Sequence, residues 1–436
     1  MVKKLVLLAI ATLTVIHVWA QNNERKLTVQ ELFELVETGS KQLQAQKQNE
    51  VVASQGVKVA KSQRLPEINS SLSASYIGNV VMTDRELNDA HGYSSPHYGN
   101  SFSVEAQQVV YAGGAIDAGI RLAELQHEQS MNATTLTRQQ QRFLALGLYL
   151  DLLKLDNRLK VFNENISLTQ VLINNISEKE QQGMALRNDI TRYELQMESL
   201  KLEREKIVNQ RNILNYQLCQ ALGMDTSVQI IPDNSIVDTT FEDGNMAEWQ
   251  ATAAVNSPSL QLSILDVKIA KANEKLAQSE MLPKVAFVAA DNFNGPITFE
   301  LPPVDKNLNV WYVGLGIQYN ISSLFKSNKK LHQAQYATKQ QELLHEAQTE
   351  QVSQQMQQAW TYYQQAYVEL QTRQKSVQLA AQNYDVMNER YLNQLALVTD
   401  MVDASNLKLN AEMDEVDARV GIAFAYCKMK LISGTL

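Results

Sequence analysis

The chain has 436 residues, a formal net charge of −8 and only two cysteines. An acidic chain is poorly suited to the phosphate backbone of nucleic acids, so this class of function is disfavoured. Two cysteines cannot hold a disulfide scaffold together, although a single bridge between Cys219 and Cys427 stays open in an oxidising compartment.

The first 20 residues have the pattern of a secretory signal peptide. Lys3 and Lys4 form a short basic region, residues 5–18 form an apolar run, and Ala20 is a small residue at the expected cleavage point. We therefore expect export of the chain and removal of residues 1–20. No later stretch is long and apolar enough to predict a membrane-spanning helix.

The rest of the chain repeats itself. One match pairs the segment Lys58–Ser62, followed by Leu65 and Pro66, with the segment Lys275–Ser279, followed by Leu282 and Pro283. A second match pairs Ala185, Leu186 and Asp189 with Ala396, Leu397 and Asp400. This spacing, roughly 210 residues, is far longer than the repeat of a solenoid protein. It indicates a duplication, with a first structural repeat over 21–245 and a second over 246–436.

Proline placement separates helical from non-helical segments, since proline interrupts helices. The first repeat is predicted to hold a helix over 28–64, strands over 67–80 and 101–111, long helices over 114–182 and 186–222, and an irregular equatorial segment over 223–245. The second is predicted to hold a helix over 257–281, strands over 284–293 and 309–321, and long helices over 327–393 and 397–432. Tyr193, Leu200 and Ile207 follow one another at seven-residue intervals, which is typical of coiled coils.

The strand near residue 311 alternates between two kinds of side chain. Trp311, Val313, Leu315 and Ile317 fall on one face, and Gly314, Gly316 and Gln318 on the other. This pattern fits a transmembrane β-strand whose apolar side faces lipid, and it also fits a half-buried strand of a soluble protein. Each repeat holds only two such strands, and open sheet edges are not tolerated in lipid. A membrane barrel would therefore have to be shared between copies of the chain.

Several short segments, in matching order, carry a resemblance to a known family: Leu27-Thr28, Arg64-Leu65-Pro66 with Met281-Leu282-Pro283, Val110–Gly114, Gln182–Ala185 with Asp189, Gln220–Gly223, and Tyr391 through Asp400 to Ala404. The chain resembles the outer membrane efflux protein family of TolC-like channels. The resemblance implies a mainly α fold with a membrane β-barrel. The barrel would have 12 strands, four from each chain of a trimer, and would continue into a long coiled-coil α-barrel.

The resemblance also implies a function and its partners. The expected protein is an exit duct in the outer membrane that extends into the periplasm. It would serve tripartite efflux or type I secretion, and it would be opened by a periplasmic adaptor (membrane fusion) protein and an inner-membrane transporter, either a proton-driven or an ABC pump. Two alternatives stay open: a periplasmic coiled-coil adaptor or scaffold, and an exported enzyme.

An enzyme is the weaker alternative, because no catalytic group of residues is evident. The histidines beyond the signal peptide are not at metal-ligand spacing on a helix, so we expect no metal, no cofactor and no enzymatic activity.

Candidate functional residues lie where the long helices of each repeat meet. Through the resemblance, Asp400, Asp403, Asp189 and Tyr391 are expected at a periplasmic gate. Asp400 and Asp403 are three residues apart and share a helix face, so in a trimer they would form rings of carboxylates that attract cations. The alternative is that Asp189 and Asp400 cap the helices that they begin. Both roles can hold together.

Overall fold

The computed structural model describes residues 24–239, 241, 244–393 and 395–436. The expected signal peptide lies outside the described residues. Within them, no helix is both long and apolar enough to cross a membrane.

The chain forms two compact units, and neither coincides with one of the predicted repeats. The first, here called the helical unit, comprises residues up to 48, 132–261 and 348–436; the second, the sheet unit, comprises 49–131 and 262–347. Each unit takes segments from both repeats, because strands and helices from the two halves pack against each other.

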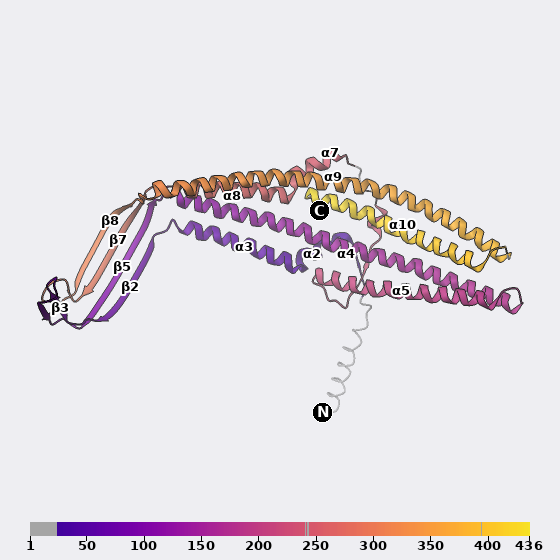
Figure 1. Cartoon of the computed structure of the whole chain (residues 1–436), viewed down its shortest axis with the longest axis horizontal. Coiled ribbons are helices and arrows are strands. Elements are labelled where there is room, and N and C mark those ends of the chain that lie inside the picture. Colours follow the sequence, from indigo (N-terminus) through magenta and orange to yellow (C-terminus); the bar gives the residue numbers. More distant parts are fainter. Residues whose placement is uncertain (1–23, 240, 242–243, 394) are drawn as a thin grey trace, which may run out of the picture. The chain divides into compact units, whose positions relative to one another are not determined.

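The sheet unit holds one four-stranded antiparallel sheet of β2 (Glu67–Tyr76), β5 (Tyr98–Tyr111), β7 (Lys284–Gly295) and β8 (Leu308–Gln318). The strands lie side by side in the order β2-β5-β7-β8 (Figure 1). The central pair, β5 and β7, joins the first half of the chain to the second.

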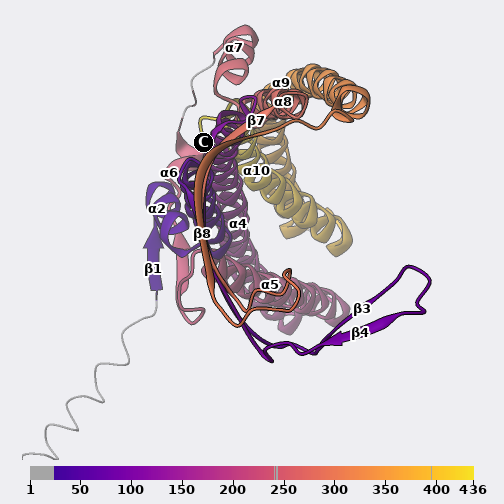
Figure 2. The same ribbon diagram turned by 90° about the vertical axis from the view of Figure 1, so that its left-hand side faces the viewer.

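The segment expected as one strand over 67–80 is different in the structure. β2 ends at Tyr76, and a separate hairpin follows, formed by β3 (Val80–Thr83) and β4 (Ala90–Tyr93). Figure 2 shows this hairpin extending sideways from the strands. β2 pairs with β5 up to Tyr76 and Tyr98, and the Tyr76 ring stacks on His97 where this pairing ends.

Helices complete the sheet unit. They are most of α3 (Lys41–Ser62) and α8 (Pro258–Ser279) and the first turns of α4 (Ala115–Gln181) and α9 (Ser323–Leu392). Leu125 of α4 packs on Leu265 and Ala272 of α8. The Gln129 amide donates to the Asp266 carboxylate at 2.6 Å, which links the same two helices.

Long helices dominate the helical unit, where α4 and α9 continue and pack with α5 (Arg187–Ala221) and α10 (Val398–Ser433). α4 has 67 residues and α9 has 70. The predicted heptad positions Tyr193, Leu200 and Ile207 are all buried, which confirms the coiled-coil pattern on α5. Ion pairs link neighbouring helices: Arg211 with Asp156, Arg158 with Asp417, and Arg373 with Asp414.

The single helix expected over 28–64 is two helices, α2 (Val29–Gly39) and α3, which meet at Ser40. The break allows α2 to pack across α4 and α5 and to bury Leu32 and Val36. β1 (Glu24–Leu27) pairs in parallel with β6 (Gln229–Pro232) beside it. The short α6 (Ser235–Asp238) and α7 (Met246–Asn256) follow, and neither was predicted.

Local features of the two halves recur at the spacing of the sequence repeat. Thr28 and Glu31 form a capping box at the start of α2, and Asn245 and Glu248 form one at the start of α7. α7 packs on α9 and α10 through Ala253, as α2 packs on α4 and α5.

One contact in the first half depends on two glycines. Gly223 has a φ of +64°, and a Cβ placed on it would lie 2.8 Å from the Gly39 Cα. A Cβ on Gly39 would lie 1.7 Å from the backbone oxygen of Leu222. The end of α2 can therefore approach the end of α5 only because neither position carries a side chain.

We predict that Gly223→Ala destabilises the chain by more than about 1–2 kcal/mol, since a left-handed backbone alone costs that much for an L-residue and the contact with Gly39 adds to it. Gly56→Ala is the matched control, because that helical glycine has open space around it. Melting temperatures from circular dichroism of the purified protein measure both. Equal melting temperatures for the two variants would contradict the role of this contact.

Candidate functional site

The four-stranded sheet has one apolar and one polar face. Directly paired residues of antiparallel strands point to the same side, and the register pairs Trp311 with Asp291, Val313 with Ala289, Leu315 with Phe287 and Ile317 with Val285. The same face continues over the other strands with Phe102, Val104, Phe293, Ile68, Leu72 and Tyr76. Asp291 is a charged exception on this face.

The opposite face carries mostly small and polar residues, with Val288, Val310 and Tyr312 among the exceptions. The Ser71 and Ser103 hydroxyls are 2.8 Å apart, and the Ser101 hydroxyl donates to the Asn294 amide oxygen at 2.6 Å. Gly314, Gly316 and Gln318 of β8 lie on this face, as predicted from the alternation. All of β8 is exposed in the single chain, so neither side of it is covered by other parts of the described structure.

The sheet is open at both edges. β2 and β8 each pair with only one strand of the described chain. Long unpaired edges expose backbone donors and acceptors, which proteins normally pair or cover.

Two tight turns that each connect a pair of long helices in the helical unit are built alike. One joins α4 to α5, and the other joins α9 to α10. After α4, the Gly183 and Met184 amides donate to the Glu180 and Lys179 carbonyls at 2.9 and 2.8 Å, with Gly183 at a φ of +73°. This is the usual glycine-assisted helix end. After α9, the Leu395 amide donates to the Arg390 carbonyl at 2.8 Å. The equivalent of Gly183 is Gln394, which lies outside the described residues.

Aspartates begin the helices that follow each turn. The Leu186 amide donates to the Asp189 carboxylate at 3.2 Å, and the Leu397 amide donates to the Asp400 carboxylate at 3.0 Å. Each carboxylate thus caps α5 or α10 and interacts favourably with the positive end of the helix. Asp403, one turn further along α10, is exposed.

The turns rest on a core of tyrosines and aliphatic side chains. Tyr193 and Tyr384 are buried there with Ile176, Ile190, Val398 and Met401, and Tyr391 packs against the cluster. The Lys179 ammonium donates to the Leu392 carbonyl at 3.4 Å, which links the two turns directly. Asp189 and Tyr391 both line a groove of about 360 Å³ between the turns.

Part of the chain is similar to a known protein family. Residues 249–434 match the model of the outer membrane efflux protein family. The match covers most of the second half of the chain. Among curated proteins, no sequence match was found.

Solved structures of outer membrane channels share the fold over almost the whole chain. VceC from Vibrio cholerae is 14% identical, with a TM-score of 0.78 over 93% of this chain and 96% of that one. CmeC of Campylobacter jejuni is 13% identical, with a TM-score of 0.75 over 93% of this chain and 85% of CmeC. CusC, described for its transmembrane channel formation, is 13% identical, with a TM-score of 0.79 over 93% of this chain and 91% of CusC. The fold is therefore the TolC-like fold, mostly helical with a β domain.

Within this fold, the structure brings Asp189 and Tyr391 together at one groove and places Asp400 at the start of α10. The sequence allowed a capping role and a gate role for Asp189 and Asp400. The structure shows the capping role. Sequence reasoning missed Tyr193 and Tyr384 as members of the turn region. The signal was present, since Tyr193 is a heptad position and Tyr384 lies two helical turns before Tyr391.

The buried tyrosines make the turn region sensitive to alkaline pH. Burial, together with the nearby Asp189 carboxylate, raises the pKa of Tyr391 to about 12, from its usual 10.0. Burial also raises the pKa of Tyr193, with Tyr391 and Tyr384 adding to the effect. The folded state keeps these phenols protonated, so their contribution to stability is complete below pH 10 and is lost as the pH rises towards about 12.

We therefore predict that the turns loosen above pH 10. The difference in ultraviolet absorbance between wild type and Tyr391→Phe, followed through an alkaline titration, isolates the ionisation of this phenol. Hydrogen exchange at the start of α10 should rise over the same range. Ionisation of Tyr391 at the pH of an exposed tyrosine would contradict the prediction.

Proposed function

We propose that this chain forms a trimeric exit duct in the outer membrane, which extends into the periplasm and exports solutes. One observation carries the proposal: the four-stranded sheet has an apolar and a polar face, and both of its edges lack a partner in the described chain. Three copies placed edge to edge would pair β8 of one with β2 of the next and close a barrel of 12 strands, which removes every open edge.

In this arrangement the apolar face contacts lipid and the polar face lines the pore. Trp311, Val313, Leu315 and Ile317 would be the lipid-facing residues of β8. The outer membrane efflux protein family and the solved outer membrane channels of the same fold support this interpretation.

The duct is passive in this proposal, since it needs no cofactor and carries out no reaction. An inner-membrane transporter, proton-driven or ATP-driven, would supply the energy, and a periplasmic adaptor would connect that pump to the duct. Tripartite efflux and type I secretion both fit this division of labour.

We further propose that the two helical turns form the periplasmic gate. Asp400 and Asp403 would line the constriction, while Asp189 and Tyr391 hold the turns in their resting position. The groove shared by Asp189 and Tyr391 and the Lys179 contact with Leu392 support a joint that could separate when a partner binds.

The assembly test is direct. We expect the purified protein to be a trimer in detergent, measured by light scattering or native mass spectrometry, and to conduct ions after insertion into a planar bilayer. A well-folded monomer that inserts into membranes would contradict the shared barrel. A protein released from cells without detergent would favour the periplasmic coiled-coil scaffold instead.

A further inference from the structure

A groove lined by basic side chains lies within the sheet unit, between the first turns of α4 and the last turns of α8. Its volume is about 610 Å³. One carboxylate lines it, that of Asp117. Four cationic side chains also line it: Arg121, Lys268, Lys271 and Lys275. Such a cluster is unusual in a chain with a net charge of −8, and it creates a local positive potential that attracts anions.

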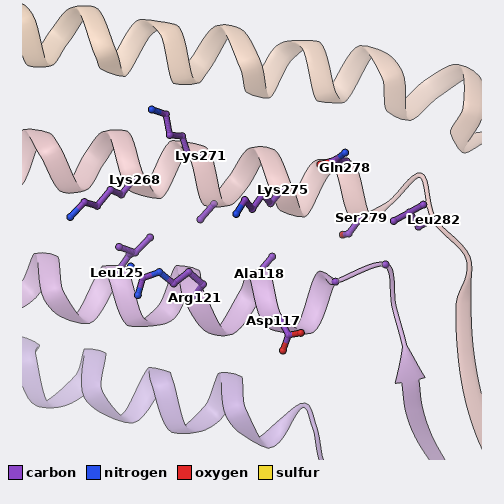
Figure 3. A pocket seen from close by; sticks show the side chains of 13 residues that line it. Asp117, Ala118, Arg121, Leu125, Lys268, Lys271, Lys275, Gln278, Ser279 and Leu282 are labelled. Atoms are coloured by element: carbon purple, nitrogen blue, oxygen red, sulfur yellow. The ribbon is translucent and has the colours of Figure 1, made fainter.

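Two of the charged groups are already paired outside the groove. Asp117 binds Arg64 at 2.6 Å and extends from α4 on the side away from α8 (Figure 3). Lys271 points towards α9, where it pairs with Glu342 at 3.2 Å. The groove itself is therefore left with an excess of cations, because its one lining carboxylate, that of Asp117, is already paired with Arg64.

The other three cations are available to a ligand. In the described part of the chain, Lys268 and Lys275 form no ion pair, and both are exposed on α8. Arg121 faces them from α4. Its closest carboxylate, Glu124, is 3.7 Å away and is shared with Lys61. Three cations from two helices thus line one groove that can receive an anionic group.

The groove also has an apolar part and lies beside the strands. Leu125 and Ala272 form its buried floor, and Leu282 closes its end towards the sheet. Gly113 and Gly114 line it just after β5 ends at Tyr111, and Leu282 lies just before β7 begins at Lys284. If the sheet spans the membrane, the groove therefore begins where lipid headgroups would lie.

We propose that this groove binds the phosphate of an anionic glycerophospholipid. Arg121, Lys268 and Lys275 would contact the phosphate, and Leu282, at the end of the groove towards the sheet, would contact the first carbons of the lipid. Arginine and lysine are the usual phosphate ligands of proteins, and basic pockets beside membrane segments bind lipid headgroups. The lipid as source of the phosphate rests on the proposed function, whereas the anion-binding groove does not.

Native mass spectrometry of the full chain in a nonionic detergent tests the proposal, with phosphatidylglycerol and phosphatidylcholine as probes. We expect the wild type to retain phosphatidylglycerol preferentially. The triple variant Arg121→Gln, Lys268→Gln, Lys275→Gln should bind it roughly a hundredfold more weakly, since each of the three basic residues near a membrane surface contributes about a factor of five. The matched control removes three exposed lysines of the same unit: Lys58→Gln, Lys326→Gln, Lys329→Gln.

The outcomes are distinct. Equal loss in the control variant, or no preference in the wild type, overturns the proposal. Displacement of the bound lipid by glycerol phosphate at comparable concentration would overturn the lipid as ligand in favour of a soluble phosphate. Planar-bilayer conductance is measured in parallel. If the wild type forms no channels, the proposed function fails; if wild type and triple variant both conduct and bind lipid equally, only this inference fails.

Discussion

Replacing Leu315 with arginine is expected to destabilise the membrane-inserted protein by about 2–4 kcal/mol, the cost of a charged side chain at the lipid-facing middle of a barrel strand. Leu315 lies near the centre of β8, opposite Phe287 on the apolar face, and its side chain is 70% exposed in the single chain. Nothing in the described chain could therefore shield the arginine from lipid.

Gly314→Arg is the matched control for this variant. The two positions are adjacent and so lie at the same depth, but Gly314 is on the polar face, where an added Cβ meets no atom within 4 Å. We expect little loss of stability there, and likewise for Gln318→Arg. Folding into phospholipid vesicles, followed by tryptophan fluorescence against urea, measures all three. Equal costs for Leu315→Arg and Gly314→Arg would show that the assignment of faces is wrong.

The second large effect is expected at the gate, as a loss of cation selectivity when Asp400 and Asp403 are both neutralised. Asparagine is the informative replacement at position 400, because its side-chain oxygen can still accept the Leu397 amide that the aspartate accepts at 3.0 Å. The charge is then removed while the cap of α10 is kept. Alanine at both positions would remove the charge and the cap together.

Single-channel recording at several salt concentrations is the measurement. Wild-type cation preference should decrease as salt rises, since the screening length falls from about 30 Å at 0.01 M to about 3 Å at 1 M. The Asp400→Asn, Asp403→Asn variant should show little preference at any salt and less block by multivalent cations. Neutralising exposed Glu178 and Glu194 controls for a general change in charge. Unchanged ion preference in the double aspartate variant would leave these residues as helix caps only.

Variants of the neighbouring residues should behave differently from the aspartate pair. Tyr391→Phe and Asp189→Asn alter the contacts at the groove between the turns without touching Asp400 or Asp403. We expect a higher resting conductance with ion preference largely kept. A loss of selectivity without a change in conductance would place these two residues in the pore instead.

Sequence patterns were sufficient to predict the long elements. Apolar spacing and the absence of proline predict α4, α5, α9 and α10 to within a few residues of their observed ends, and strict alternation predicts both faces of β8. These signals are local: a seven-residue repeat or a two-residue alternation can be read along the chain without knowing its neighbours. The aspartate caps belong to the same class, since each binds a backbone amide only three residues away.

Contacts between distant segments were decided only by the tertiary structure. The approach of the end of α2 to the end of α5 depends on Gly39 and Gly223, and the joining of the two halves depends on the pairing of β5 with β7. The basic groove likewise needs Arg121 and Lys275 to face each other from separate helices. The periodicity of the sequence does not predict these contacts, because they depend on which elements pack together. The sequence by itself thus determined the lengths and faces of the helices and strands, and the packing of those faces determined which charges, rings and glycines meet.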